Sequence, residues 1–282
     1  MKKILIPTDF SNNAKQAAKV GAFLARQVGA KVVLLHVNTA VAYTPPLPDY
    51  SVPQAFDWEA YEENAKEALL ALEKDLSQQA DFAALSFEKR VEEGLLHQAI
   101  RQVVEEEGID IVVMGTKGAT GAVEFFIGSN TEKVIRTAPC PVLAVPENSG
   151  DFEVKSVLVP TTLRPDQVYV FEWLAEWQKY FSFTVSLLYL NDPLGLGKNK
   201  VIEEKAREMG KGAGLRNYRI LIEGNTFNEE AAILEVAHEQ HVDLIAMGTH
   251  QRKGLSHLLF GSLTEDMANH SDIPVLSIPL KK

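Results

Sequence analysis

The sequence contains a single cysteine, no excess of basic residues and no long apolar run. Cys140 has no second cysteine to pair with, which excludes an intrachain disulfide and favours a reducing compartment. The net charge of −10 is shared equally between residues 1–146 and 147–282, so neither half offers the positive surface that nucleic acid or an anionic membrane requires. No segment approaches the roughly 18 apolar residues of a membrane span. We therefore expect a cytoplasmic protein with neither nucleic acid nor a membrane as partner.

Several motifs of enzymes are missing as well. The absence of Gly-x4-Gly-Lys-Ser/Thr excludes a P-loop, and the absence of Gly-x-Ser-x-Gly argues against a serine hydrolase. No Cys/His cluster indicates zinc, and the pair His238 and His241 has no third ligand in view. Cys140 lies between two prolines, without a His or Asp pattern, and is predicted to be a small core residue. The sequence thus predicts no catalytic residue and no metal ligand.

A glycine-rich frame occurs twice. The first copy reads GTKG, nine residues and GS from position 115, and the second reads GTHQ, nine residues and GS from position 248. An apolar run precedes each frame, and a helix is predicted to begin at each Gly-Ser pair. Free backbone N–H groups and the positive end of a helix can hold phosphate, and glycine permits close approach. The alternative is that the glycines only form a tight turn and that Ser129 only caps its helix.

The repeat extends beyond the glycines. Residues 110–146 and 243–279 align without a gap at an offset of 133 residues, with 13 identities in 37 positions. We therefore predict a duplicated domain, 1–147 and 152–282, joined by a short polar linker.

Strands and helices alternate within each copy. In the first copy we expect strands at 3–7, 31–37, 86–91, 109–115 and 141–145, and helices near 12–28, 57–80, 95–107 and 129–138. In the second copy we expect strands at 156–160, 183–190, 218–222, 243–248 and 274–278. This alternation predicts an α/β fold of two tandem, doubly wound, five-stranded parallel sheets, Rossmann-like and packed as a pseudo-dimer. The apolar strands 142–145 and 275–278 are predicted to join the halves. Residues 39–56 are either a stiff solvated loop or a flap beside the site.

Asp9 follows the first predicted strand, at the same edge of the sheet as the glycine turn. Ligands of such sheets bind at the carboxyl ends of the strands, where a carboxylate could accept hydrogen bonds from a nucleotide base or sugar. The alternative is that Asp9 is the N-cap of the helix beginning near Asn12. The second copy has Thr162 in this place and Gln251 instead of Gly118, so we expect the two halves to differ in function.

The chain resembles the universal stress protein family in three segments: Pro7-Thr8-Asp9, the frame Met114-Gly115-x2-Gly118-x9-Gly128-Ser129, and Ala138-Pro139-Cys140-Pro141-Val142. The resemblance covers both halves, and the glycine frame is typical of the ATP-binding branch. It implies that Thr8, Asp9 and Val37 surround adenine and ribose. It implies positions along the ribose and phosphates for Met114, Gly115, Gly118, Gly128, Ser129, Asn130 and Thr131. Lys117 either contacts phosphate or is a solvated loop residue.

The predicted function is that of an ATP-binding stress-response protein, with the nucleotide in the first half as a signal or a structural ligand. The sequence does not distinguish ATP from ADP or AMP, and it leaves bound Mg²⁺ open. One alternative is a slow ATPase or phosphotransferase that uses Glu124 or Glu132. Another is a protein-interaction module that works without nucleotide. We expect the halves to pair within the chain, and a homodimer of the whole chain is a further expectation.

Overall fold

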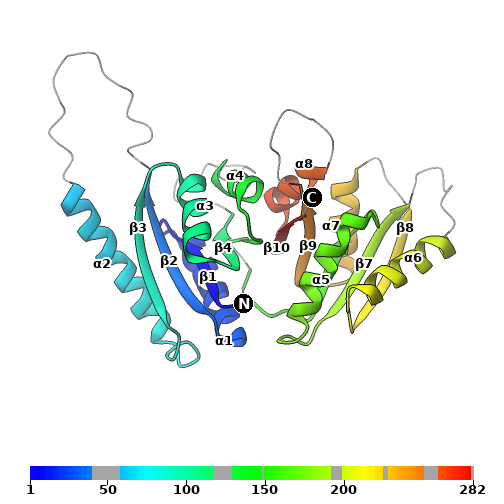
Figure 1. Cartoon of the computed structure of the whole chain (residues 1–282), viewed down its shortest axis with the longest axis horizontal. Helices are drawn as coiled ribbons and strands as arrows, with labels where there is room; N and C mark the ends of the chain where they lie inside the picture. Colours follow the sequence, from blue (N-terminus) through cyan, green and yellow to red (C-terminus); the bar gives the residue numbers. More distant parts are fainter. Residues whose placement is uncertain are drawn as a thin grey trace, which may run out of the picture.

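Ten β-strands form one continuous sheet in the computed structural model (Figure 1). The structure describes residues 1–39, 58–116, 129–147, 149–150, 152–191, 199–224, 228–250 and 260–280. The strand order is β3-β2-β1-β4-β5-β10-β9-β6-β7-β8, so the second half repeats the order of the first in reverse across the sheet. The predicted α/β architecture is confirmed, and the two five-stranded sheets merge into one.

The elements of the first half agree with the predicted ranges. They are β1 Lys3–Pro7, α1 Asn12–Val28, β2 Lys31–Asn38, α2 Trp58–Ser77, β3 Phe87–Glu93, α3 Leu96–Glu107, β4 Ile111–Gly115, α4 Ser129–Thr137 and β5 Val142–Val145. The elements of the second half are β6 Ser156–Pro160, the 3-10 helix η2 Pro165–Gln167, α5 Val168–Trp177, β7 Thr184–Asn191, α6 Asn199–Gly212, β8 Tyr218–Gly224, α7 Glu229–Glu239, β9 Leu244–Thr249, α8 Phe260–His270 and β10 Val275–Pro279.

The halves meet where β5 pairs with β10. This pairing is antiparallel, with Leu143 opposite Leu276, whereas the pairings within each half are parallel. The prediction that strands 142–145 and 275–278 join the halves is therefore confirmed. On one face of the sheet α4 and α8 lie side by side at the junction (Figure 1).

Helices cover both faces of the sheet and enclose two apolar cores. The first core contains residues of α1, α2, α5 and α6, and the second contains residues of α3, α4, α7 and α8. Successive residues of β1 contribute alternately, with Ile4 and Ile6 in the first core and Leu5 in the second. The strands are therefore apolar throughout, as parallel strands covered on both faces must be.

The start and the close packing of α1 follow from a few residues. The Ser11 hydroxyl oxygen accepts a hydrogen bond from the Ala14 N–H at 3.2 Å, and Gly29 ends the helix with φ of 68°. A Cβ on Gly21 would lie 2.4 Å from Ile6 Cδ1, so only glycine lets the helix approach β1 this closely. The packed helix fixes where the turn after β1 lies.

Candidate functional site

A tight turn after β1 places Thr8 and Asp9 at the carboxyl edge of the sheet. The Thr8 N–H donates to the Leu35 carbonyl oxygen at 2.8 Å, and the Thr8 hydroxyl oxygen accepts from the Phe10 N–H at 3.0 Å. Phe10 has φ of 64°, so the chain reverses sharply here. Thr8 is buried, whereas Asp9 is exposed. The turn thus presents the Asp9 side chain at the surface of this edge.

The N-cap of α1 is Ser11, not Asp9. The carboxylate oxygen Oδ1 of Asp9 accepts from the Ser11 N–H at 3.1 Å, one residue before the helix begins. The interpretation of Asp9 as the N-cap is wrong, because Ser11 already holds the first turn of the helix through the Ala14 N–H.

His36 supports the same turn from β2, a role that we did not predict. Its ring stacks on Phe10, with 4.8 Å between ring centroids. Nδ1 lies 2.9 Å from the Thr8 carbonyl oxygen, and Nε2 lies 2.9 Å from the Tyr61 hydroxyl. A neutral imidazole with its proton on Nδ1 satisfies both contacts, donating to Thr8 and accepting from Tyr61. Burial raises the pKa of Tyr61. The one sequence signal for this role of His36 was a polar residue inside an otherwise apolar strand.

Gly115 ends β4, beside β1, and its lack of a side chain admits Asn13 of α1. A Cβ on Gly115 would lie 2.8 Å from Asn13 Cγ, and the φ of Gly115 lies outside the left-handed region. The glycine is therefore required by close approach. Asn13 is buried there, a neighbour that sequence patterns did not reveal, and the predicted Met114 and Val37 are buried in the adjoining core.

Thr131 ties the start of α4 to the end of β4. Its buried hydroxyl donates to the Gly115 carbonyl oxygen at 3.1 Å. The hydroxyl proton is engaged in this bond, and Thr131 thereby positions the start of the helix. Ser129 is the first residue of α4, and Asn130 is exposed in its first turn. The positive end of α4 therefore lies at the carboxyl edge of β4.

Some predictions lie outside the residues that the structure describes. These concern Lys117, Gly118, Gly128, Glu124, Gln251 and residues 40–56 of the proline-rich segment. Of the two carboxylates considered for hydrolysis, Glu132 is described, and it pairs with Arg136 one helical turn away. The structure thus brings together Thr8, Asp9, Val37, Met114, Gly115 and the start of α4.

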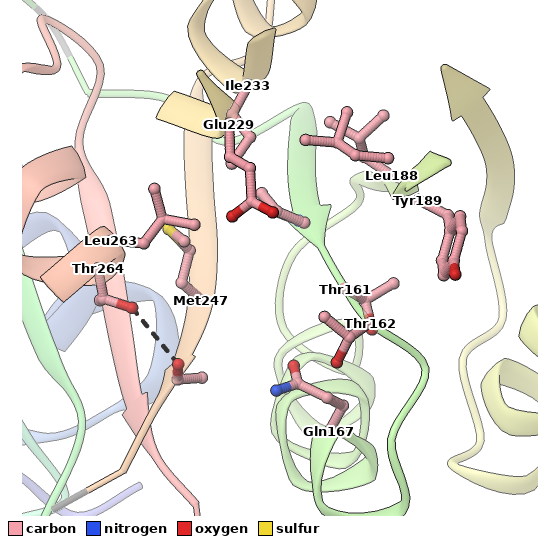
Figure 2. Close-up of a pocket in the computed structure, with 13 residues that line it drawn as sticks. Thr161, Thr162, Gln167, Leu188, Tyr189, Glu229, Ile233, Met247, Leu263 and Thr264 are labelled. Atoms are coloured by element: carbon pink, nitrogen blue, oxygen red, sulfur yellow. Dashed lines mark hydrogen bonds between the residues drawn. The ribbon is translucent and has the colours of Figure 1, made fainter. Parts of the chain in front are cut away.

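The second half repeats the turn and the helix contact. The Thr161 hydroxyl oxygen accepts from the Leu163 N–H at 3.1 Å, and Leu163 has φ of 54°. Thr264 in α8 donates to the Gly248 carbonyl oxygen at 3.4 Å, as Thr131 does in α4 (Figure 2). The duplicated sequence therefore builds two equivalent edges.

A pocket that is partly open to solvent occupies this edge of the second half (Figure 2). Its walls come from the ends of β6, β7 and β9, from η2, and from the first turns of α7 and α8. The lining residues are Pro160, Thr161, Thr162, Gln167, Leu188, Tyr189, Leu190, Glu229, Ile233, Met247, Gly248, Leu263 and Thr264.

In the described parts of both halves, the Cys140 thiol lies in the core and the possible metal-ligating side chains do not cluster. Cys140 is buried, which confirms the prediction of a small core residue, and burial raises the pKa of its thiol to about 12. Within the described ranges, no group of three or more His, Cys, Asp or Glu side chains could hold a metal ion. The described helices include none that is long and apolar enough to cross a membrane.

The fold is that of a tandem α/β protein in which both halves have the same turn and the same helix contact at one edge of a shared sheet. Comparison with protein families agrees, because the universal stress protein family model matches residues 1–146 and again 153–279. The chain belongs to the universal stress protein family.

Individual relatives match either one half or the whole chain. A universal stress protein of Thermus aquaticus is 37% identical over 51% of this chain and 98% of its own length. The universal stress protein Slr1230 of Synechocystis is 23% identical over 98% of this chain and 99% of its own length. A solved universal stress protein from Archaeoglobus fulgidus, 19% identical, covers 98% of each chain with a TM-score of 0.73, which shows that the tandem fold is shared.

Proposed function

We propose that the first half of this chain binds an adenine nucleotide, in the first instance ATP, as a signal or structural ligand in a stress response. The single observation that carries the proposal is the exposed Asp9 carboxylate at the sheet edge where β4 ends at Gly115 and α4 begins. A nucleotide needs an acceptor for its base or ribose and a positive helix end for its phosphates.

The contacts around Gly115 favour this assignment. The Thr131 hydroxyl ties the start of α4 to the end of β4, and the Asn13 side chain packs against Gly115 where a Cβ would otherwise lie, so both residues fix the sheet edge that a ligand would meet. The Asp9 carboxylate accepts a hydrogen bond from the Ser11 N–H, and this bond orders the carboxylate before any ligand binds. The glycine frame from Gly115 to Ser129 supplies the remaining support at the level of sequence.

The proposal assigns the nucleotide to the first half alone. Thr162 stands where Asp9 stands in the first half, and Gln251 replaces Gly118. An exchange of aspartate for threonine removes the charged acceptor. The Gln251 side chain adds bulk at the position of the glycine frame that is predicted to border the phosphates.

A calorimetric titration of the nucleotide-free full chain with Mg-ATP tests the proposal. We expect one site per chain, and we expect Asp9→Asn to weaken binding by about tenfold or more, since a charged hydrogen bond is lost. Asp75→Asn, which removes an exposed carboxylate of α2, serves as the matched control and should bind ATP as the unaltered chain does. Two equal sites per chain would contradict the assignment to one half.

Two other results would favour the alternatives. Absence of heat together with an unchanged melting temperature would support an interaction module that works without nucleotide. Steady phosphate release would support a slow ATPase, and loss of that release in Glu124→Gln or Glu132→Gln with retained binding would identify the base. The proposal places the protein in the cytoplasm, in keeping with the single free Cys140.

A further inference from the structure

The pocket of the second half has apolar walls and one charged side chain among the described residues that line it. Ile233, Met247 and Leu263 form one wall, and the Glu229 carboxylate points into the space between them and the turn after β6 (Figure 2). Glu229 makes no ion pair or hydrogen bond within the described part of the chain. This arrangement differs from a phosphate site, where positive charge or free N–H groups must face the ligand.

The two halves differ in the charge at the start of the helix that borders this edge. Helix α7 begins with Glu229 and Glu230, whereas the equivalent α3 has no acidic residue in its first turn. At the repeat offset of 133 residues, Glu229 corresponds to Leu96. The carboxylate therefore neutralises the positive end of α7 on the pocket side and repels an anion.

Neutral polar groups complete the pocket. Gln167 is only 7% exposed, and its amide lines the pocket without a hydrogen-bond partner among the described residues. The Thr162 hydroxyl oxygen is buried and likewise has no partner there. The neighbouring Asp166 engages His250, with 3.3 Å between Oδ2 and Nε2, so that imidazole is held by a carboxylate. A buried hydroxyl without a partner is unfavourable, and a ligand with polar groups would satisfy the Thr162 hydroxyl and bond to the Gln167 amide beside it.

We propose that this pocket binds a small organic cation, an ammonium or guanidinium group on a partly apolar body. The cationic nitrogen lies against the Glu229 carboxylate. The apolar body contacts Ile233, Met247 and Leu263, and the Gln167 amide and Thr162 hydroxyl hydrogen-bond to its remaining polar groups. The second half is then a binding unit for a ligand of opposite charge to a nucleotide.

Methionine methyl groups report on each half separately. The chain has five methionines; Met247 lines this pocket, and Met114 is its counterpart beside the candidate nucleotide site of the first half. In the full chain labelled with ¹³C at the methionine methyls, we expect phenethylamine and agmatine to shift the Met247 signal in a saturable manner and to leave Met114 unchanged. We expect ATP to leave Met247 unchanged. Because ATP binding in the first half is read at Met114, failure of either proposal is seen separately.

Two matched comparisons test the role of charge. 2-Phenylethanol has the apolar body of phenethylamine without its cation. It should bind at least about tenfold more weakly than phenethylamine. Glu229→Gln should weaken phenethylamine by a similar factor. Glu235→Gln removes an exposed carboxylate elsewhere on α7 and should have no effect.

The proposal is overturned by any of three results. The first is that neither amine shifts Met247. The second is that 2-phenylethanol binds as well as phenethylamine, or that Glu229→Gln binds the amine as well as the unaltered chain. The third is a saturable shift of Met247 by ATP, which would make the pocket a second nucleotide site.

Discussion

Arg136 in α4 and Glu265 in α8 form a two-point ion pair between the halves. Arg136 Nε lies 3.1 Å from Oε1 of Glu265, and Nη2 lies 2.6 Å from Oε2. The Glu265 side chain is only 12% exposed, and its hydrogen bond raises the pKa of Arg136. At the repeat offset Arg136 corresponds to Asn269 and Glu265 to Glu132, so the pair has no symmetric copy. The pseudo-dimer is therefore asymmetric at its own interface.

Arg136→Ala is expected to lower the free energy of unfolding by about 1–3 kcal/mol, because it leaves Glu265 largely buried without its partner. Urea unfolding of the full chain measures the loss. Arg101→Ala breaks an exposed pair with Glu105 one turn away in α3 and should cost less than about 0.5 kcal/mol. Equal losses in the two variants would show that the pair does not stabilise the interface.

Gly115→Ala is expected to destabilise the chain by about 1–3 kcal/mol, because its Cβ would overlap the Asn13 side chain. The same substitution should cost less in an Asn13→Ala background, and the difference gives the coupling between the two positions. Gly224→Ala is the control, since a Cβ there meets nothing within 4 Å. Additive effects at positions 13 and 115 would refute the close approach as the reason for glycine.

Thr131→Val should cost about 1 kcal/mol, because the isosteric side chain leaves the Gly115 carbonyl oxygen without its donor. Thr264→Val removes the longer equivalent bond of 3.4 Å and should cost less. If the first half binds the nucleotide, only Thr131→Val should also weaken ATP. Denaturant titration measures stability, and calorimetry measures affinity; an equal effect of both variants on ATP would count against the assignment.

Cys140 should remain unreactive in the folded protein and should make folding less favourable at high pH. Burial raises the pKa of its thiol to about 12, whereas an unfolded thiol titrates near about 8.5. Above the lower value the unfolded state loses the proton first, so stability falls as pH rises toward the folded pKa. Unfolding measured between these limits should show a flatter pH dependence in Cys140→Ala. Rapid modification of the native thiol at pH 8 would contradict its burial.

The sequence predicted the fold well because the signals for it are local and repeated. Apolar runs such as 111–114 and 244–247 specify buried parallel strands, and the duplicated pattern made each half support the interpretation of the other. The join through strands 142–145 and 275–278 was predictable too, since an exposed apolar strand edge needs a partner.

The side-chain contacts of the site were harder to predict from the sequence. Asn13 meets Gly115, and His36 meets Thr8, only after the helices and strands have packed, so no short pattern records either contact. The bond from Thr131 to the Gly115 carbonyl oxygen was not predicted either, because a hydroxyl at a helix start can bond to backbone as readily as to a ligand. Glu229 is exposed at the start of α7, and only the folded pocket shows where its carboxylate points (Figure 2).

The antiparallel contact of β5 and β10 has a consequence for how such a chain can change over time. In a homodimer of single-domain chains, the two copies would have to associate in solution. A substitution in the gene would then change both subunits at once. Here the linker keeps the partner always within reach, at an effective concentration independent of how much protein is made. Each half can therefore accumulate its own substitutions at the carboxyl edge of its strands while the contact of β5 with β10 is preserved. Every molecule then carries one copy of each half.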